Sequence, residues 1–93
     1  MIVGILTVEG HLPAVTSLKG KRQILQSVKK TISNRFNVSI AEVGFQDLWQ
    51  RTLIGATSVS SDRNVVENEL RRVLETIEAR DDLYVTQHTV EFI

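Results

Sequence analysis

The sequence has 93 residues and a mass of 10.5 kDa, which fits a single domain. Hydrophobic residues make up 42% and charged residues 24%, so the composition excludes a disordered chain, a collagen and a coiled-coil rod. No apolar run approaches the ~18 residues of a membrane span, and the start MIVGILTVEG lacks the basic segment of a signal peptide. The absence of cysteine excludes disulfides and thiolate chemistry. We therefore expect a cytoplasmic protein.

The 11 basic and 11 acidic residues balance in number but not in position. Residues 1–41 hold six bases and one acid, Glu9, whereas residues 42–93 hold five bases and ten acids. Such a split predicts a molecule with one positive and one negative side. Two solvated helix faces of opposite sign would account for the split as well as a binding surface does.

The first part of the chain predicts a strand followed by a helix. Residues 2–11 are rich in β-branched and aliphatic types, which is typical of a strand. Pro13 ends this strand, because proline has no N–H to donate in a central ladder. Ser17 is the expected N-cap of a helix that runs to about residue 35 or 36, with Asn37 as its stop. The apolar residues of this helix share one arc: Leu18, Ile24, Leu25, Val28, Ile32 and Phe36.

The remaining elements are a strand at 38–45, a turn at 46–49, a strand at 50–60, a helix that Asp62 caps and that runs to about Ala79, and a last strand at 83–93. The second helix presents one apolar face, formed by Val66, Leu70, Val73, Leu74 and Ile77. The order βαββαβ predicts an α+β fold: one ferredoxin-like two-layer sandwich over residues 1–93, with a four-stranded antiparallel sheet and both helices on one face. Right-handed crossovers set the strand order 4-1-3-2.

One face of this sheet would remain uncovered. The first strand is apolar on both faces, with Val3 and Ile5 on one and Ile2, Leu6 and Val8 on the other. In a regular last strand, Tyr84, Thr86, His88, Val90 and Phe92 would share a face, so neither of its faces is purely polar. An uncovered apolar patch usually marks an interface. We therefore expect a homodimer, the commonest way of covering such a patch.

No group of residues predicts catalysis. The two histidines, His11 and His88, fall on neighbouring strands, but antiparallel pairing places His11 nearer Leu83, so we expect no metal site. The serine cluster at 58–61 has no adjoining histidine, and helix capping explains it. No glycine-rich loop for phosphates is present. We expect no catalytic residues, no cofactor and a non-enzymatic protein.

The run from Gln46 to Arg51 is the densest mixture of polar and aromatic residues and holds the sole tryptophan. In one interpretation, Asp47, Trp49 and Arg51 form a binding corner, where Trp49 stacks on a ring and Arg51 holds an anion. In the other, Trp49 closes the edge of the sandwich or a dimer seam, and Asp47 pairs with Arg51. The second role is the more usual one for a lone large aromatic residue in a small domain.

The first helix carries a stripe of bases without acids. On a helical wheel, an arc of ~100° contains Lys19, Arg22, Lys29 and Lys30, with uncharged polar residues between them, while Lys21 and Arg35 flank the apolar face. Such a stripe is typical of surfaces that bind phosphate backbones, although a solvated helix back is the plainer interpretation. The first and third strands contain no aromatic residues, which excludes the base stacking of RNA-recognition motifs.

Three segments together are similar to the YlxP-like family, a domain of unknown function (number 503): MIVGILTVEGHLP, SLKGKRQILQSVKKTISNRFNVSIAEV and QDLWQRTLIGATSVSSD. The resemblance covers nearly the whole chain. It implies a small bacterial cytoplasmic protein of ferredoxin-like fold without an established activity. Genes of the family often lie beside those for translation initiation factor two and ribosome-binding factor A, which implies a role near the ribosome.

These observations lead to two expectations of function. The first is an accessory protein that contacts RNA or the ribosome through the four bases of the first helix. The second is a homodimeric protein-interaction module or small-ligand sensor that uses the open sheet face and the dimer seam. Neither involves a membrane.

Overall fold

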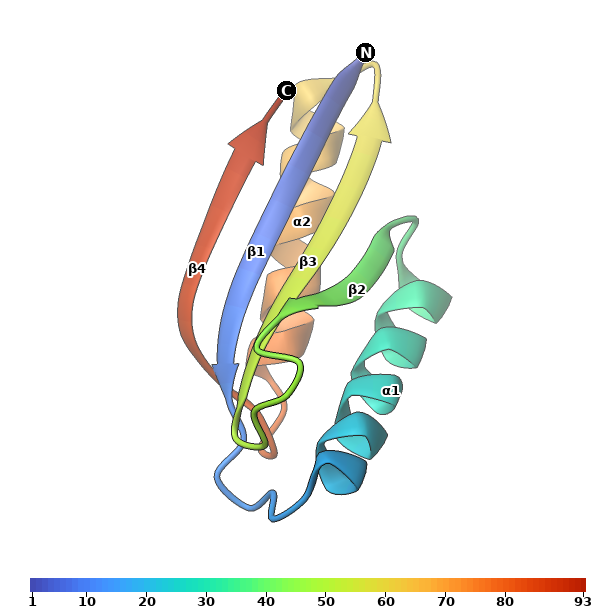
Figure 1. Cartoon of the computed structure of the whole chain (residues 1–93). Coiled ribbons are helices and arrows are strands. Elements are labelled where there is room, and N and C mark those ends of the chain that lie inside the picture. The colour runs from blue at the N-terminus through green and yellow to red at the C-terminus, as the bar shows by residue number, and fades with distance from the viewer.

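A computed structural model describes the whole chain, residues 1–93. Six elements follow one another: β1 (Ile2–His11), α1 (Leu18–Arg35), β2 (Ser39–Gly44), β3 (Arg51–Ser60), α2 (Arg63–Glu78) and β4 (Tyr84–Phe92) (Figure 1). This confirms the predicted βαββαβ order, and each predicted end lies within about one residue of the observed one. The chain therefore has the ferredoxin-like α+β fold.

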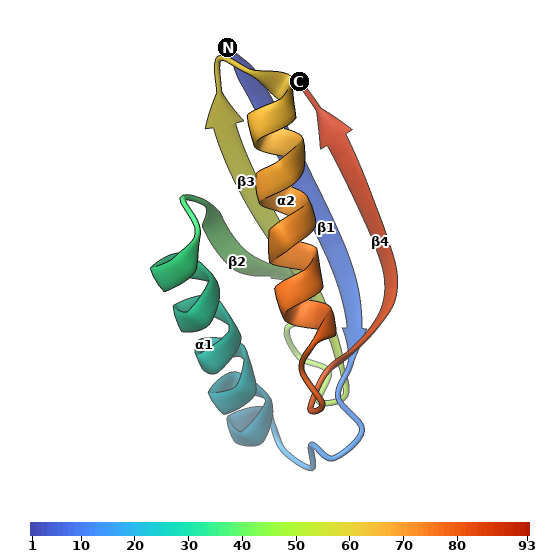
Figure 2. The same ribbon diagram turned by 180° about the vertical axis from the view of Figure 1, so that it is seen from behind.

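The strands form one antiparallel sheet in the order β2-β3-β1-β4, which is the predicted order counted from the other edge. Both helices lie on the same face of the sheet: α2 runs across its centre, and α1 lies beside β2 (Figure 2). The molecule is elongated, with extents of 42 × 21 × 17 Å. Neither helix combines the length and the apolarity that crossing a membrane requires.

Both helices begin at the predicted caps. The Ser17 side chain accepts a hydrogen bond from the Gly20 N–H at 3.0 Å, and the Asp62 carboxylate accepts one from the Asn64 N–H at 2.9 Å. Each cap residue has an extended backbone, as N-caps require, so each satisfies an N–H that the first helical turn leaves free. These two residues therefore fix where the chain turns from strand or loop into helix.

The core lies between the sheet and the helices. The apolar arcs predicted for the helices supply much of it, with Leu25, Val28, Ile32, Phe36, Val66, Leu70, Val73 and Ile77 all buried. Leu18, Ile24 and Leu74, at the margins of the same arcs, are half-buried. The sheet contributes Leu6, Val8, Ile54 and Ala56 from its two central strands. Burial thus follows the 3.6-residue period of the helices and the two-residue period of the strands.

The last strand departs from the expected alternation. Val85 pairs with Gly10 and His88 pairs with Val8, so three steps along β4 match two steps along β1. This β-bulge accommodates one extra residue, and the Thr86 hydroxyl donates a hydrogen bond to the carbonyl of Glu9 at 3.1 Å. Val85 consequently shares the helix side with His88, and the expectation of a regular strand was wrong at this point.

The turn between α2 and β4 is closed by an ion pair. Arg80 donates two hydrogen bonds to Asp82, at 2.8 and 2.9 Å, and a longer one of 3.4 Å to Ser27 on α1. The bonds from Arg80 hold the pKa of the Asp82 carboxyl below its usual range. This carboxylate therefore favours the folded state above the pKa of a free aspartate, and its contribution is lost as the pH falls through the lower pKa of the folded chain.

Helix α2 packs tightly against the sheet at Gly4. A Cβ atom at this position would overlap Val66 and would lie 2.8 Å from Leu70 Cδ1. Both side chains are fully buried and have no space to move into. The glycine in β1 is therefore required for α2 to approach the sheet.

We predict that Gly4→Ala lowers the free energy of unfolding by ~1–3 kcal/mol, the usual cost of overpacking a core. Gly55→Ala is the control, because its new methyl group would lie 3.3 Å from the Val43 side chain, which is exposed and free to adjust. The measurement is thermal unfolding followed by circular dichroism. Equal melting temperatures for the two variants would contradict the prediction.

Candidate functional site

A buried lysine organises the end of the molecule where α1 begins. The Lys21 side chain is 1% exposed, and its ammonium forms an ion pair with Glu42 on β2 at 2.9 Å. The same Glu42 oxygen accepts a hydrogen bond from the Thr52 hydroxyl on β3 at 2.6 Å. The expectation that Lys21 flanks the apolar face was wrong: the helical period places it between Val28 and Ile32, in the centre of that face.

The ammonium of Lys21 also holds the loop between β2 and β3. It donates hydrogen bonds of 2.6 Å to the carbonyl oxygens of Phe45 and Leu48. The Phe45 carbonyl accepts a further bond from the Leu48 N–H at 3.0 Å, which closes a turn. Phe45 has a φ of 55°, a left-handed conformation that is uncommon for residues other than glycine. The ammonium stabilises this conformation because it bonds directly to the carbonyl of Phe45.

Gln50 ties the same loop to the segment that joins β1 to α1. Its side-chain amide donates to the carbonyls of Pro13 and Val15, at 3.2 and 3.1 Å. Its own carbonyl accepts from the Leu12 N–H at 2.9 Å and from His11 Nδ1 at 3.0 Å. Because a carbonyl only accepts, Nδ1 carries the proton, and Nε2 is the acceptor of the neutral ring. The loop is therefore fixed from both sides.

The fixed loop borders a shallow, open hollow of about 570 Å³, which is lined by His11, Asp47, Leu48, Trp49, Gln50 and Arg51. The structure thus brings together all three residues of the predicted binding corner. Trp49 is 52% exposed, so it does not fill the core of the chain. The expected pair between Asp47 and Arg51 is absent: Arg51 pairs with Glu9 at 3.2 Å, and its guanidinium lies 4.1 Å from the centre of the Phe45 ring.

The two histidines lie apart, as the strand register predicts. His11 pairs with Tyr84, next to Leu83, whereas His88 pairs with Val8 on the other side of the bulge. His11 lies at the hollow, and His88 is exposed between β4 and α2. No cluster of three or more histidine, aspartate or glutamate side chains is arranged to bind a metal ion.

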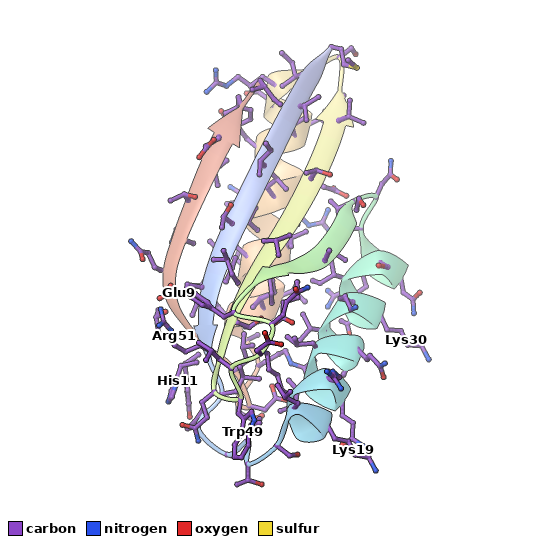
Figure 3. The ribbon with its side chains drawn as sticks, viewed as in Figure 1. Glu9, His11, Lys19, Lys30, Trp49 and Arg51 are labelled. Carbon is purple, nitrogen blue, oxygen red and sulfur yellow. The ribbon has the colours of Figure 1, made fainter.

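The basic stripe of α1 lies on its outer side. All four bases (Lys19, Arg22, Lys29 and Lys30) are exposed. None of them forms an ion pair with a carboxylate. Figure 3 shows Lys19 and Lys30 pointing away from the sheet. The rise of 1.5 Å per residue makes the stripe about 16 Å long.

On helix α2, two of the bases are paired with carboxylates, unlike the stripe on α1. Arg63 pairs with Glu67 at 3.0 Å, and Arg71 lies 3.8 Å from Glu75, each one helical turn away. Arg72, by contrast, lies 5.3 Å from the centre of the Phe36 ring, and Arg35 on α1 lies 5.5 Å from the same ring. The uncompensated positive charge is therefore on α1 and on the side of α2 that faces it.

Comparison with known proteins gives the family. Residues 3–90 match the model of a family described as "Protein of unknown function (DUF503)". The chain belongs to this family. It is also 51% identical over 63 residues to the uncharacterized protein YlxP of Bacillus subtilis (strain 168), an alignment that covers 68% of each chain. Membership confirms the resemblance seen in the sequence and brings no activity with it.

Sequence reasoning missed two features of the site. The burial of Lys21 was detectable, because the residue falls inside an apolar arc and the sequence supplies an acid, Glu42, in the facing strand. The bonds of Gln50 to Pro13 and Val15 had no local signal, since they join segments more than thirty residues apart.

We predict that Lys21→Ala lowers the free energy of unfolding by ~3–5 kcal/mol, because it leaves the largely buried carboxylate of Glu42 without its ion-pair partner. Lys21→Met with Glu42→Leu should cost less than the single change, since no unpaired charge remains. Arg71→Ala, which breaks an exposed pair, is the control and should cost less than ~1 kcal/mol. The measurement is urea unfolding, and a Lys21 variant as stable as the control would contradict the prediction.

Proposed function

We propose that the protein is a non-enzymatic accessory factor that binds RNA, free or within the ribosome, through Lys19, Arg22, Lys29 and Lys30. The observation that carries this proposal is that all four bases are exposed on one side of α1 and none is paired with a carboxylate. Unpaired bases in a row keep their full attraction for phosphates. The ribosomal context implied by the family resemblance agrees with an RNA partner.

The alternative of a merely solvated helix back explains the pattern less well. A surface helix gains solubility from charges of either sign, and α2 has a mixed surface with pairs such as Arg63–Glu67. Bases of one sign on α1 repel each other, which slightly destabilises the helix. A bound phosphate backbone neutralises this repulsion and releases counterions, and both effects favour binding.

We predict that Lys29→Gln with Lys30→Gln weakens binding to all RNA sequences alike. Each lost phosphate contact lowers the slope of log K against log salt by ~0.7–0.9, so the double variant should lower it by about 1.4–1.8. Glutamine keeps the helix, because its propensity is close to that of lysine. The measurement is fluorescence anisotropy of labelled RNA between about 50 and 200 mM salt, a range over which phosphate contacts weaken strongly, together with co-sedimentation with ribosomal subunits.

The matched control is Arg63→Gln with Arg71→Gln, which removes the same charge from α2. Both arginines are engaged by glutamates, so this variant should change binding little. Arg72 is not used in the control, since it lies beside α1 at Phe36. Equal losses from the two variants would show that only total charge matters, and no binding at the lowest salt would disprove the proposal.

A second candidate function, a homodimeric interaction module, is favoured by the open face of the sheet. Val59 on β3 is 55% exposed and pairs with Val3, and Val43 on β2 is 58% exposed. Half-buried Ile5 and Leu53 lie on the same face. The helices do not cover this face, so a second copy of the chain would bury apolar surface there.

We predict that light scattering gives twice the 10.5 kDa mass of the chain, and that Val59→Lys gives the single mass. A lysine at this position would place a charge within the apolar patch and would prevent close packing. Val65→Lys on α2 is the control, because Val65 is similarly exposed (51%) but lies on the helix side. A single mass for the unmodified protein at micromolar concentration would rule out the dimer.

A further inference from the structure

We infer that Trp49 stacks on an unpaired nucleobase of the bound RNA. The phosphates of the same RNA are held by the basic side chains of the α1 stripe. This inference rests on the proposed function and adds to it a contact that single-stranded RNA offers and double-stranded RNA does not. Bases in a duplex are stacked inside, whereas unpaired bases are free to stack on aromatic side chains. The site is the hollow formed by the loop between β2 and β3.

Trp49 is exposed although its loop is fixed. About half of its surface, 52%, is accessible, and the neighbouring Leu48 is 45% exposed. Lys21 bonds to the backbone on both sides of the turn, and Gln50 bonds to the segment before α1. A large apolar ring exposed on an anchored loop is preorganised for a partner, since little side-chain or loop entropy is lost on binding.

The charges around the hollow favour a neutral ring over a phosphate. Asp47 lines the hollow without a cationic partner and repels anions. The guanidinium of Arg51 is engaged by Glu9 at 3.2 Å and by the Phe45 ring. A nucleobase is uncharged and carries N–H groups that are able to donate hydrogen bonds to the Asp47 carboxylate. The hollow therefore suits a nucleobase, and the phosphates of the RNA suit the basic stripe of α1.

The basic stripe begins at the same end of the molecule as the hollow. The loop that carries Trp49 is bonded to the first turn of α1 through Lys21 and to the residue Val15 just before it. Lys19 belongs to that first turn, and Figure 3 shows Trp49 and Lys19 at the same end of the molecule. One RNA strand is thus able to lie along α1 with its phosphates on the basic side chains and to place one nucleobase on Trp49.

The fluorescence of the protein provides a direct test, because Trp49 is its only tryptophan. The full chain is titrated with decaadenylate and with an abasic sugar–phosphate oligomer of the same length. Both oligomers carry the phosphates, but only decaadenylate carries bases. We expect decaadenylate to quench the emission of Trp49 and the abasic oligomer to bind without comparable quenching.

Three variants separate stacking from other contacts. Trp49→Ala should weaken binding of decaadenylate by ~5- to 150-fold, the range for one stacked base, and Trp49→Phe should restore most of it. Leu48→Ala removes an exposed apolar side chain from the same hollow and should have a much smaller effect. None of the three should change the salt slope, since none removes a charge. Circular dichroism confirms that each variant is folded, as expected for exposed positions.

The outcomes distinguish this inference from the proposed function. If decaadenylate binds with the expected salt slope, leaves the emission of Trp49 unquenched and binds Trp49→Ala as tightly as the unmodified protein, stacking is disproved and the basic face stands. A loss in Trp49→Ala that Leu48→Ala matches, or that Trp49→Phe does not repair, also disproves stacking. If neither oligomer binds at about 50 mM salt, where phosphate contacts are strong, the proposed function fails and this inference fails with it.

Discussion

The ammonium of Lys21 is the interaction on which the candidate site depends. A buried charge is tolerated only where acceptors surround it, and here Glu42 and two carbonyls of the following loop supply them. Three separate parts of the chain, the start of α1, strand β2 and the loop after it, therefore have to meet at one point. The left-handed backbone of Phe45 is stabilised by this requirement, and the loop that carries Trp49 is held in place by it.

Helix α1 carries several basic residues and no acidic residue. Of the bases on α1, only Lys21 is neutralised by a carboxylate, and it belongs to the buried face. The four exposed bases of the stripe (Lys19, Arg22, Lys29 and Lys30) gain no ion pair within the chain, because no acid lies within ion-pair distance of them. Their charge is therefore uncompensated within the chain, whereas Arg63 and Arg71 on α2 are paired with glutamates.

The fold was predictable from the sequence because it depends on short periods and local caps. The apolar arcs of the helices, Ser17 and Asp62 each act within a few residues, and handedness then fixes the strand order. The bulge at Thr86 and the pairing of Arg51 with Glu9 were not predictable, since both depend on the register between distant strands. The basic stripe was predictable from the helical period alone. The anchoring of the loop that exposes Trp49 was not, because it depends on long-range bonds of Gln50 and Lys21.

In the proposed RNA complex, phosphate contacts and base stacking would have different effects on binding. Phosphate contacts act on every RNA and weaken with salt, so the stripe alone would bind duplexes and single strands alike. Stacking needs an accessible base and is insensitive to salt, so it adds preference for unpaired segments without adding net charge. Because Lys21 anchors the Trp49 loop to the helix that carries the stripe, the distance between the two contacts is fixed by the fold. In the proposed complex, a strand that makes only one of the two contacts would lose the affinity of the other, so binding would favour RNA that is locally unpaired.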